Sequence, residues 1–375
     1  MPKANHAYSP TNRVKDLDTT RPVTAAQSGG QFNPVNVSQA VDVVGFNYQQ
    51  YDYDKFHRQN PTMKMTSSED VSGLMERGVY VTDKSKNLID AYDLQNPGWG
   101  AIHRTAWKAI DERPFVAGCF IWTGFDYHGE PTPYAWPTIG SFFGIMDMCG
   151  FPKTVYYYYQ SWWTDKDVLH IAPHWNWKGR EGQPIPVWVN SNADNVELML
   201  NGKSLGKKEM PRNGHLEWIV NYAPGKLEAV GYKKGRKLSA MVQTTGEPYR
   251  IVVQAAKNSL TPDGKDAAVF NITVVDKQGL QVPDASNLLH FSLTGNAHII
   301  GVGNGDPSSH EPDKYTTGGW QRSLFSGKCQ VIIQSDAVGQ RSGVNGQPAG
   351  ISGDVQFRAE GEGLQAGTAT LHRAL

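Results

Sequence analysis

Glu69, Tyr48 and Trp122 are the side chains best suited to act together chemically, because each stands at the end of an apolar stretch. Glu69 follows two hydroxyl residues, Ser67 and Ser68, which suits a carboxylate nucleophile held ionised by hydrogen bonds. A phenol can donate to that carboxylate, and an indole face is an apolar platform for a pyranose ring. On its own, Glu69 would more often be the surface partner of a cation. The three side chains together predict a carbohydrate site.

The elements that must position these side chains alternate between strand and helix up to about residue 165. The apolar patterns predict strands at 20–26, 41–48, 63–68 and 115–122, and helices at 13–18, 53–59, 101–111 and 153–163. Such alternation indicates βαβ units and a parallel sheet. In a parallel barrel the strand ends meet at the mouth of one pocket, but a closed barrel needs eight strands and this pattern supplies four.

After residue 165 the sequence changes to short alternating strands separated by turn residues. Asn201-Gly202 lies between two such strands and predicts a two-residue hairpin turn, because both positions favour positive φ. We expect a partial barrel domain at 1–165, an immunoglobulin-like β-sandwich at 166–246 and a second at 247–375. The fold class is therefore multidomain, α/β followed by all-β.

Composition excludes several classes of function. The formal net charge is zero, which argues against nucleic acid and anionic membranes as partners. We expect no cofactor and no metal. The three cysteines (Cys119, Cys149 and Cys329) are scattered, and the His-Glu pair at 310–311 has no second histidine at the spacing of a metal site. The glycine-rich run at 301–305 lacks the strand-to-helix context of a nucleotide-binding loop. The first residues lack the apolar region of a signal peptide, so the compartment stays open, with periplasm or secretion plausible for an intact protein.

Several motifs resemble the C-terminal half of family-2 glycoside hydrolases, in their bacterial β-galactosidase branch. The likeness covers nearly the whole chain, and the motif IWTGFDYHGEP at 121–131 is especially specific. The other matching motifs are RPVT at 21–24, GFNY at 45–48, SE at 68–69, FGIMD at 143–147, GFPK at 150–153, PHWNW at 173–177, VELMLNGKS at 196–204 and GVGNGDP at 301–307. The resemblance implies the C-terminal half of a (β/α)₈ TIM barrel followed by two immunoglobulin-like sandwiches.

The resemblance also implies retaining hydrolysis of terminal β-D-galactosides through a covalent glycosyl-enzyme. Glu69 would be the nucleophile, Tyr48 would support it, and Trp122 would line the sugar pocket together with Asn47. In such enzymes a second, protonated carboxyl lies about 5 Å from the nucleophile. Two further carboxylates, Asp126 and Glu130, either contact sugar hydroxyls or pair with cations; Arg113 and Arg77 are the expected cations.

Two departures from the family pattern matter. The family's acid/base glutamate follows an asparagine, and no Asn-Glu pair occurs in this sequence. Asp70 stands where the family usually has a small or hydroxyl residue, and a like charge beside Glu69 would raise the pKa of one of the two if both face the pocket. Alternatives are a non-catalytic carbohydrate-binding or scaffolding module and a half barrel that pairs with itself or another chain, so a homo-oligomer is possible.

We expect the 375-residue chain to hydrolyse a nitrophenyl β-galactoside slowly or not at all, because the acid/base motif is missing from the sequence. A nitrophenol leaving group is the permissive test, since it needs the least help from an acid. Absorbance assays on the purified chain check this, and turnover at the rate of intact family enzymes would contradict it.

Overall fold

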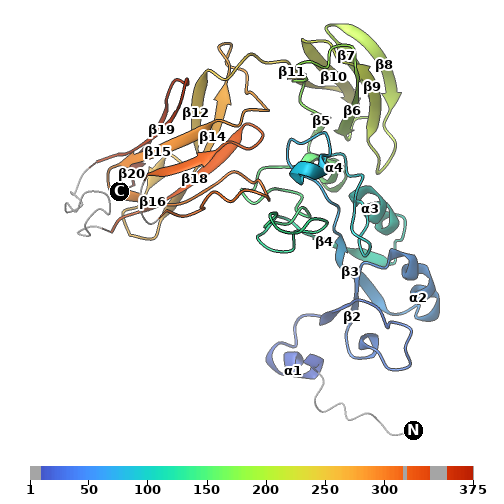
Figure 1. Cartoon of the computed structure of the whole chain (residues 1–375). Coiled ribbons are helices and arrows are strands. Elements are labelled where there is room, and N and C mark those ends of the chain that lie inside the picture. Colours follow the sequence, from blue (N-terminus) through green and yellow to red (C-terminus); the bar gives the residue numbers. More distant parts are fainter. Residues whose placement is uncertain (1–9, 316–318, 338–352, 375) are drawn as a thin grey trace.

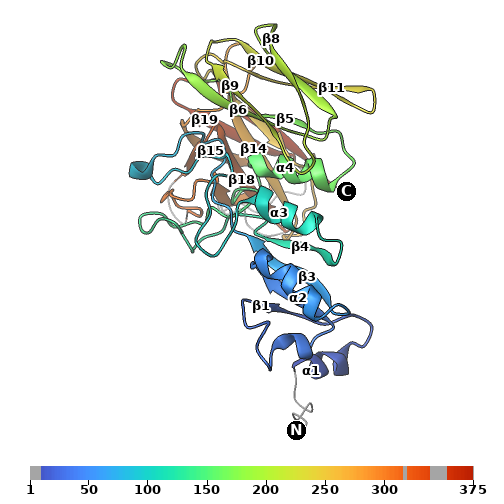
Figure 2. The same cartoon turned by 90° about the vertical axis from the view of Figure 1, so that its right-hand side faces the viewer.

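The computed structural model describes residues 10–315, 319–337 and 353–374. Figures 1 and 2 show a parallel sheet with its helices near the N-terminus and two β-rich bodies at the far end of the molecule. None of the helices in the described part of the chain combines the length and the apolar character that a membrane crossing requires.

The N-terminal sheet consists of four parallel strands in the order β1-β2-β3-β4. The strands are β1 Thr24–Gln27, β2 Val43–Asn47, β3 Lys64–Val71 and β4 Val116–Trp122. The helices are α1 Pro10–Leu17, α2 Tyr53–Gln59, α3 His103–Asp111 and α4 Thr154–Trp163, with short 3₁₀ helices at Val37–Gln39, Gln50–Asp52 and Lys84–Lys86. The predicted alternation of strand and helix is confirmed.

One face of this sheet is covered by α2 and α3. Apolar side chains of β2, β3 and β4 pack there against rings and aliphatic groups of the two helices (Val44, Phe46, Met65, Val116, Tyr53, Phe56 and Ile110). Phe46 meets Tyr53 and Phe56 edge to face at centroid distances of 5.3 and 5.2 Å. Burying these rings fixes the helices against the strands, which sets where the strand ends lie.

Two predicted strand boundaries near the site differ most from the structure. The first strand begins at Thr24 rather than near residue 20, because the N–H of Val23 donates to the Asp42 carboxylate at 2.7 Å and Pro22 has no N–H. The third strand continues past Ser68 to Val71. Glu69 is therefore inside a strand, close to its end.

The first sandwich has sheets in the orders β5-β6-β9 and β11-β10-β7-β8. Its strands are β5 Leu169–Ala172, β6 Pro184–Ser191, β7 Asn195–Leu200, β8 Lys203–Glu209, β9 Leu216–Asn221, β10 Lys226–Lys233 and β11 Arg236–Gln243. The predicted hairpin is confirmed: Asn201 and Gly202 join β7 to β8 with φ values of 50° and 79°. Trp175, fully buried, anchors the core between the sheets.

The second sandwich has sheets in the orders β12-β14-β18-β16 and β13-β20-β19-β15-β17. Its strands are β12 Arg250–Ala255, β13 Ser259–Leu260, β14 Ala267–Val275, β15 Leu288–Thr294, β16 Ala297–Gly303, β17 Trp320–Ser323, β18 Lys328–Ser335, β19 Val355–Gly361 and β20 Gly367–Arg373. A single strand at 324–334 is expected from the sequence, but a turn closed by Phe325 and Lys328 interrupts it. The domain boundaries at 165 and 246 stay predictions.

Arg77, in the segment after β3, joins this N-terminal region to the second sandwich. Its guanidinium donates to Asp147 at 2.5 Å and to the carbonyls of Asn304 at 2.8 Å, Phe325 at 2.8 Å and Ser326 at 3.1 Å. The Arg77 and Asp147 side chains are 7 % and 0 % exposed. A planar guanidinium can serve all four acceptors, whereas a lysine ammonium has only three donors.

We expect Arg77→Lys to loosen the second sandwich from the rest of the molecule, because buried carbonyls and Asp147 lose donors. Breaking a buried pair of this kind costs about 3–5 kcal/mol. Limited proteolysis and thermal unfolding should show earlier release of the sandwich, while the control Arg21→Lys, whose side chain is 82 % exposed, should behave as wild type. Equal behaviour of the two variants would contradict the role given to Arg77.

Candidate functional site

Glu69 and Tyr48 meet where β2 and β3 end. The Tyr48 hydroxyl lies 2.8 Å from Glu69 Oε1 and 2.7 Å from Ser72 Oγ, and Asn47 Nδ2 lies 3.3 Å from Glu69 Oε2. Burial raises the pKa of the Tyr48 phenol, and the neighbouring Glu69 charge acts in the same direction. The phenol therefore stays protonated and can donate to the carboxylate.

A local irregularity of β3 turns Glu69 toward these partners. The register of β3 shifts against both neighbouring strands near Ser67 and Asp70. Ideal alternation would place Ser67 and Glu69 on the same face. Instead Ser67 and Asp70 are both fully buried, while Ser68 and Glu69 both reach Asn47. An irregularity that re-aims a side chain is typical of functional sites.

The backbone around Glu69 is also strained. Tyr48, Val71 and Ser72 have φ values of 59°, 85° and 54°, which are rare for residues with a Cβ and most costly for a β-branched one. At Gly45 a Cβ would lie 2.6 Å from Ser68 Oγ, so glycine allows β2 to approach β3 closely here. Strain held in place at one end of a sheet points to function there.

Trp122, at the end of β4, joins the same edge through Tyr127. Its indole N–H donates to the Tyr127 hydroxyl at 3.1 Å, and Tyr127 in turn hydrogen-bonds the carboxylate of Glu130. Burial raises the pKa of Tyr127, with Glu130 and Glu69 adding to the rise. Tyr127 therefore feels the charges of both carboxylates. The structure brings Glu69, Tyr48, Asn47, Trp122 and Glu130 to one edge of the sheet.

Asp126 does not belong to this group. Its carboxylate is buried 2.6 Å from Lys153 Nζ and accepts from the N–H of Gly144 at 2.8 Å. Burial raises the pKa of Asp126 and the ammonium of Lys153 opposes the rise. Both oxygens of Asp126 are thus engaged within the protein, and its contact with sugar hydroxyls stays a prediction.

The cations expected to pair with Asp126 or Glu130 are engaged elsewhere. Arg113 pairs with Asp54 at 2.7 Å, and Arg77 pairs with Asp147 as described above. Neither hydrogen-bonds the carboxylate of Glu130, whose partner is Tyr127. Glu130 therefore pairs with neither expected cation, and its contact with sugar hydroxyls stays a prediction.

Asp70 lies on the helix-covered face of the sheet, away from the partners of Glu69. Its Oδ1 accepts from the Val71 N–H at 2.8 Å and from Gln50 Nε2, while Oδ2 is buried without a hydrogen bond. Burial raises the pKa of Asp70 to about 6, and its hydrogen bonds oppose the rise. The cause of the raised pKa is thus desolvation.

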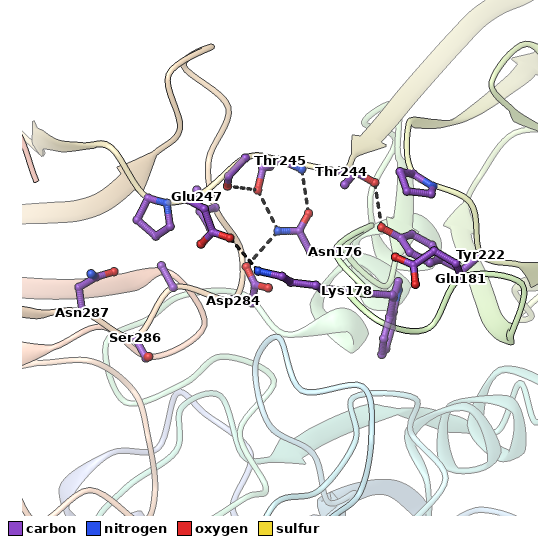
Figure 3. Close-up of a pocket in the computed structure, with 16 residues that line it drawn as sticks. Asn176, Lys178, Glu181, Tyr222, Thr244, Thr245, Glu247, Asp284, Ser286 and Asn287 are labelled. Atoms are coloured by element: carbon purple, nitrogen blue, oxygen red, sulfur yellow. Dashed lines mark hydrogen bonds and ion pairs between the residues drawn. The ribbon is translucent and has the colours of Figure 1, made fainter. Parts of the chain in front are cut away.

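The described residues include no group of three or more His, Cys, Asp or Glu side chains placed to hold a metal ion. A cavity of about 540 Å³ lies between the two sandwiches, distant in sequence from Glu69 (Figure 3). Its polar side chains bond one another: Asn176 Nδ2 lies 2.8 Å from Thr245 Oγ1 and 3.0 Å from Asp284 Oδ1, and Lys178 pairs with Glu247 at 2.9 Å. The cavity is the joint between the sandwiches, and its hydrogen bonds hold the linker.

Comparison with known proteins connects this geometry to a family. Residues 251–370 match the glycoside hydrolase family 2 C-terminal domain 5, and residues 182–239 match a domain of unknown function, DUF4982. The β-galactosidase BoGH2A of Bacteroides ovatus is 39 % identical over 372 residues, which are 94 % of this chain and 42 % of that protein. The chain belongs to glycoside hydrolase family 2. The resemblance stated from the sequence is confirmed.

Other family-2 relatives agree with this assignment. A putative β-glucuronidase of Formosa agariphila is 34 % identical over 239 residues, covering 62 % of this chain and 23 % of that protein. A β-glycosidase structure from Bacteroides vulgatus superposes with a TM-score of 0.83 at 29 % identity, covering 99 % of this chain and 49 % of that one. A family-2 member from Bacteroides cellulosilyticus gives 0.78 at 26 %, covering 99 % and 48 %. The chain spans about half the length of these relatives, or less.

Two aromatic residues at the site were missed. Tyr127 lies inside the quoted motif 121–131 but received no role, and Trp99 was seen only as part of a loop. The Trp99 side chain lies close enough to the Tyr48 phenol to act on it, in the direction that lowers the pKa of that phenol. Nothing periodic marks a loop residue, so only its aromatic type in a Gly/Pro-rich turn could have drawn attention to it.

We expect Asp70→Asn to stabilise the chain relative to wild type at neutral pH but not in acid. A carboxyl whose pKa rises from 3.8 to about 6 on folding favours the folded state fully below pH 3.8, and this advantage is lost as pH rises through 6. The swing is on the order of 3 kcal/mol.

Urea denaturation at pH 4 and pH 7.5 measures this difference. Asp16→Asn on α1, with a side chain 66 % exposed, reports the effect of removing a surface charge. A difference between wild type and Asp70→Asn that is the same at both pH values would contradict the raised pKa.

Proposed function

We propose that this chain carries the nucleophile of a retaining β-galactosidase, in strands β1 to β4 of a (β/α)₈ barrel. Four parallel strands in sequential order, with helices on one face and reactive groups at their C-terminal ends, support the barrel assignment. The observation that carries the function is the Glu69 carboxylate, bonded to Tyr48 and Asn47 beside Trp122.

Glu69 attacks the anomeric carbon of a terminal β-galactoside. The C–O bond to the leaving group breaks, its electron pair leaves on the oxygen, and an ester forms between the sugar and Glu69. Tyr48 and Asn47 hold the attacking carboxylate, which keeps it oriented until the bond forms. Trp122 presents its indole to the sugar, and Glu130, held by Tyr127, accepts from sugar hydroxyls.

The charges at the site favour a neutral sugar over a glucuronide. The relatives divide between β-galactosidases and β-glucuronidases, and of the two substrates only the glucuronide carries a carboxylate. In the part of the chain that the structure describes, Glu69, Tyr48, Trp122 and Tyr127 have no basic hydrogen-bond partner. A glucuronide carboxylate would meet two carboxylates without a compensating cation, which opposes its binding.

Covalent labelling tests the proposal. A dinitrophenyl β-galactoside fluorinated beside the anomeric carbon should label the chain, because its leaving group needs little acid help and the fluorine slows hydrolysis of the ester. Peptide mass spectrometry should place the sugar on Glu69. The matching glucuronide reagent should label at least about tenfold more slowly.

Glu69→Gln should abolish the label completely. Glu112→Gln, which changes an exposed carboxylate on α3, should keep it. A label on another residue, or an undiminished label in Glu69→Gln, would refute the nucleophile. Sugar binding without any label would favour a carbohydrate-binding module instead.

A further inference from the structure

Trp99 has an indole that is 50 % exposed, at the end of the long segment between β3 and α3. The turn that carries it is closed by a hydrogen bond from Gly100 N to Pro97 O at 3.0 Å. The Asn96 amide reinforces this turn by donating to the carbonyls of Pro97 at 2.9 Å and Gly100 at 3.0 Å. The indole is therefore partly accessible to a ligand.

This turn is fixed against the end of β3. The N–H of Ala101 donates to Val71 O at 2.7 Å, and a Cβ at Gly100 would lie 2.5 Å from the same oxygen and 3.1 Å from the Ser72 Cβ. Glycine at position 100 therefore permits the contact. Because Ser72 Oγ lies 2.7 Å from the Tyr48 hydroxyl, the turn is linked to the group that holds Glu69.

The topology of the sheet gives the side on which Trp99 lies. β2 and β4 are the two neighbours of β3. Trp122 ends β4, whereas Trp99 contacts the phenol that follows β2. The two indoles thus flank Glu69 from the two neighbouring strands, which is the arrangement expected of two walls of one sugar pocket.

We propose that Trp99 is a substrate-positioning residue whose indole packs on the pyranose ring of a neutral β-hexoside beside the Tyr48 phenol. The inference rests on the proposed function and deepens it, by assigning a second aromatic wall. Trp175, by contrast, has no exposed surface and packs wholly within a core. The partly exposed ring beside Tyr48 leaves a face for a ligand.

The test uses the full chain, methyl β-galactoside and isothermal titration. Trp99→Ala should weaken binding by about tenfold or more, the loss expected for one aromatic contact, and Trp99→Phe should restore most of it. Trp136→Ala is the matched control, because Trp136 is 77 % exposed and packs edge-on against His310 of the second sandwich. Its affinity should stay within about twofold of wild type.

The outcomes separate this inference from the proposed function. Galactoside binding of equal strength in wild type and Trp99→Ala would overturn the role of Trp99 and leave the nucleophile standing. Loss of binding in Trp99→Ala, in a chain that forms no covalent label, would uphold Trp99 and refute the nucleophile. Absence of any galactoside binding to the wild-type chain would overturn both. Circular dichroism of each variant confirms that it is folded.

Discussion

The hydrogen bond between the Tyr48 phenol and the Glu69 carboxylate is the interaction on which the described site depends. It spans two neighbouring parallel strands, so β2 and β3 must end at the same level and approach closely. Gly45 allows the approach, and the register shift in β3 points Glu69 toward Asn47. The positive φ of Tyr48 completes the geometry. Three separate local features thus serve one contact of 2.8 Å.

Buried charges hold the loops around this contact. The segments 72–102 and 123–153 contain little regular structure, so their carbonyls need partners other than a ladder of backbone hydrogen bonds. Lys153 supplies such a partner by donating to Met75 O at 2.7 Å and Phe142 O at 3.2 Å while pairing with Asp126. Arg77 likewise donates to backbone carbonyls, and these belong to the second sandwich. These buried charged side chains thus hold loops in place, rather than helices or strands.

Local patterns made much of the fold predictable from the sequence. Helix α2 matches its expected bounds, and the Asn201-Gly202 turn follows from the φ preferences of those two residues. The candidate site was visible because Tyr48, Glu69 and Trp122 end strands whose ends must meet. The pairing of Asp126 with Lys153 and the approach of Trp99 to Tyr48 were not visible. Both join loops that are distant in sequence, and neither repeats with the period of a helix or a strand.

The face of the sheet on which the Asp70 side chain lies could not be predicted either, because it depends on where the register of β3 shifts. A regular strand would have turned Ser67 and Glu69 to one face and Ser68 and Asp70 to the other. One irregularity separates two adjacent carboxylates into different surroundings, one beside a phenol and one beneath the helices. Their chemical difference arises from the backbone, since the side chains are almost alike.

Arg77 has a consequence for how such proteins can diversify. It follows Glu69 in the same segment, yet three of its acceptors are main-chain carbonyls of the second sandwich. Main-chain acceptors are offered by any sequence that keeps the same backbone path. The sandwich can therefore change most of its side chains without loss of the attachment, but an insertion or deletion near residues 304–326 would detach it from the segment that follows the proposed nucleophile.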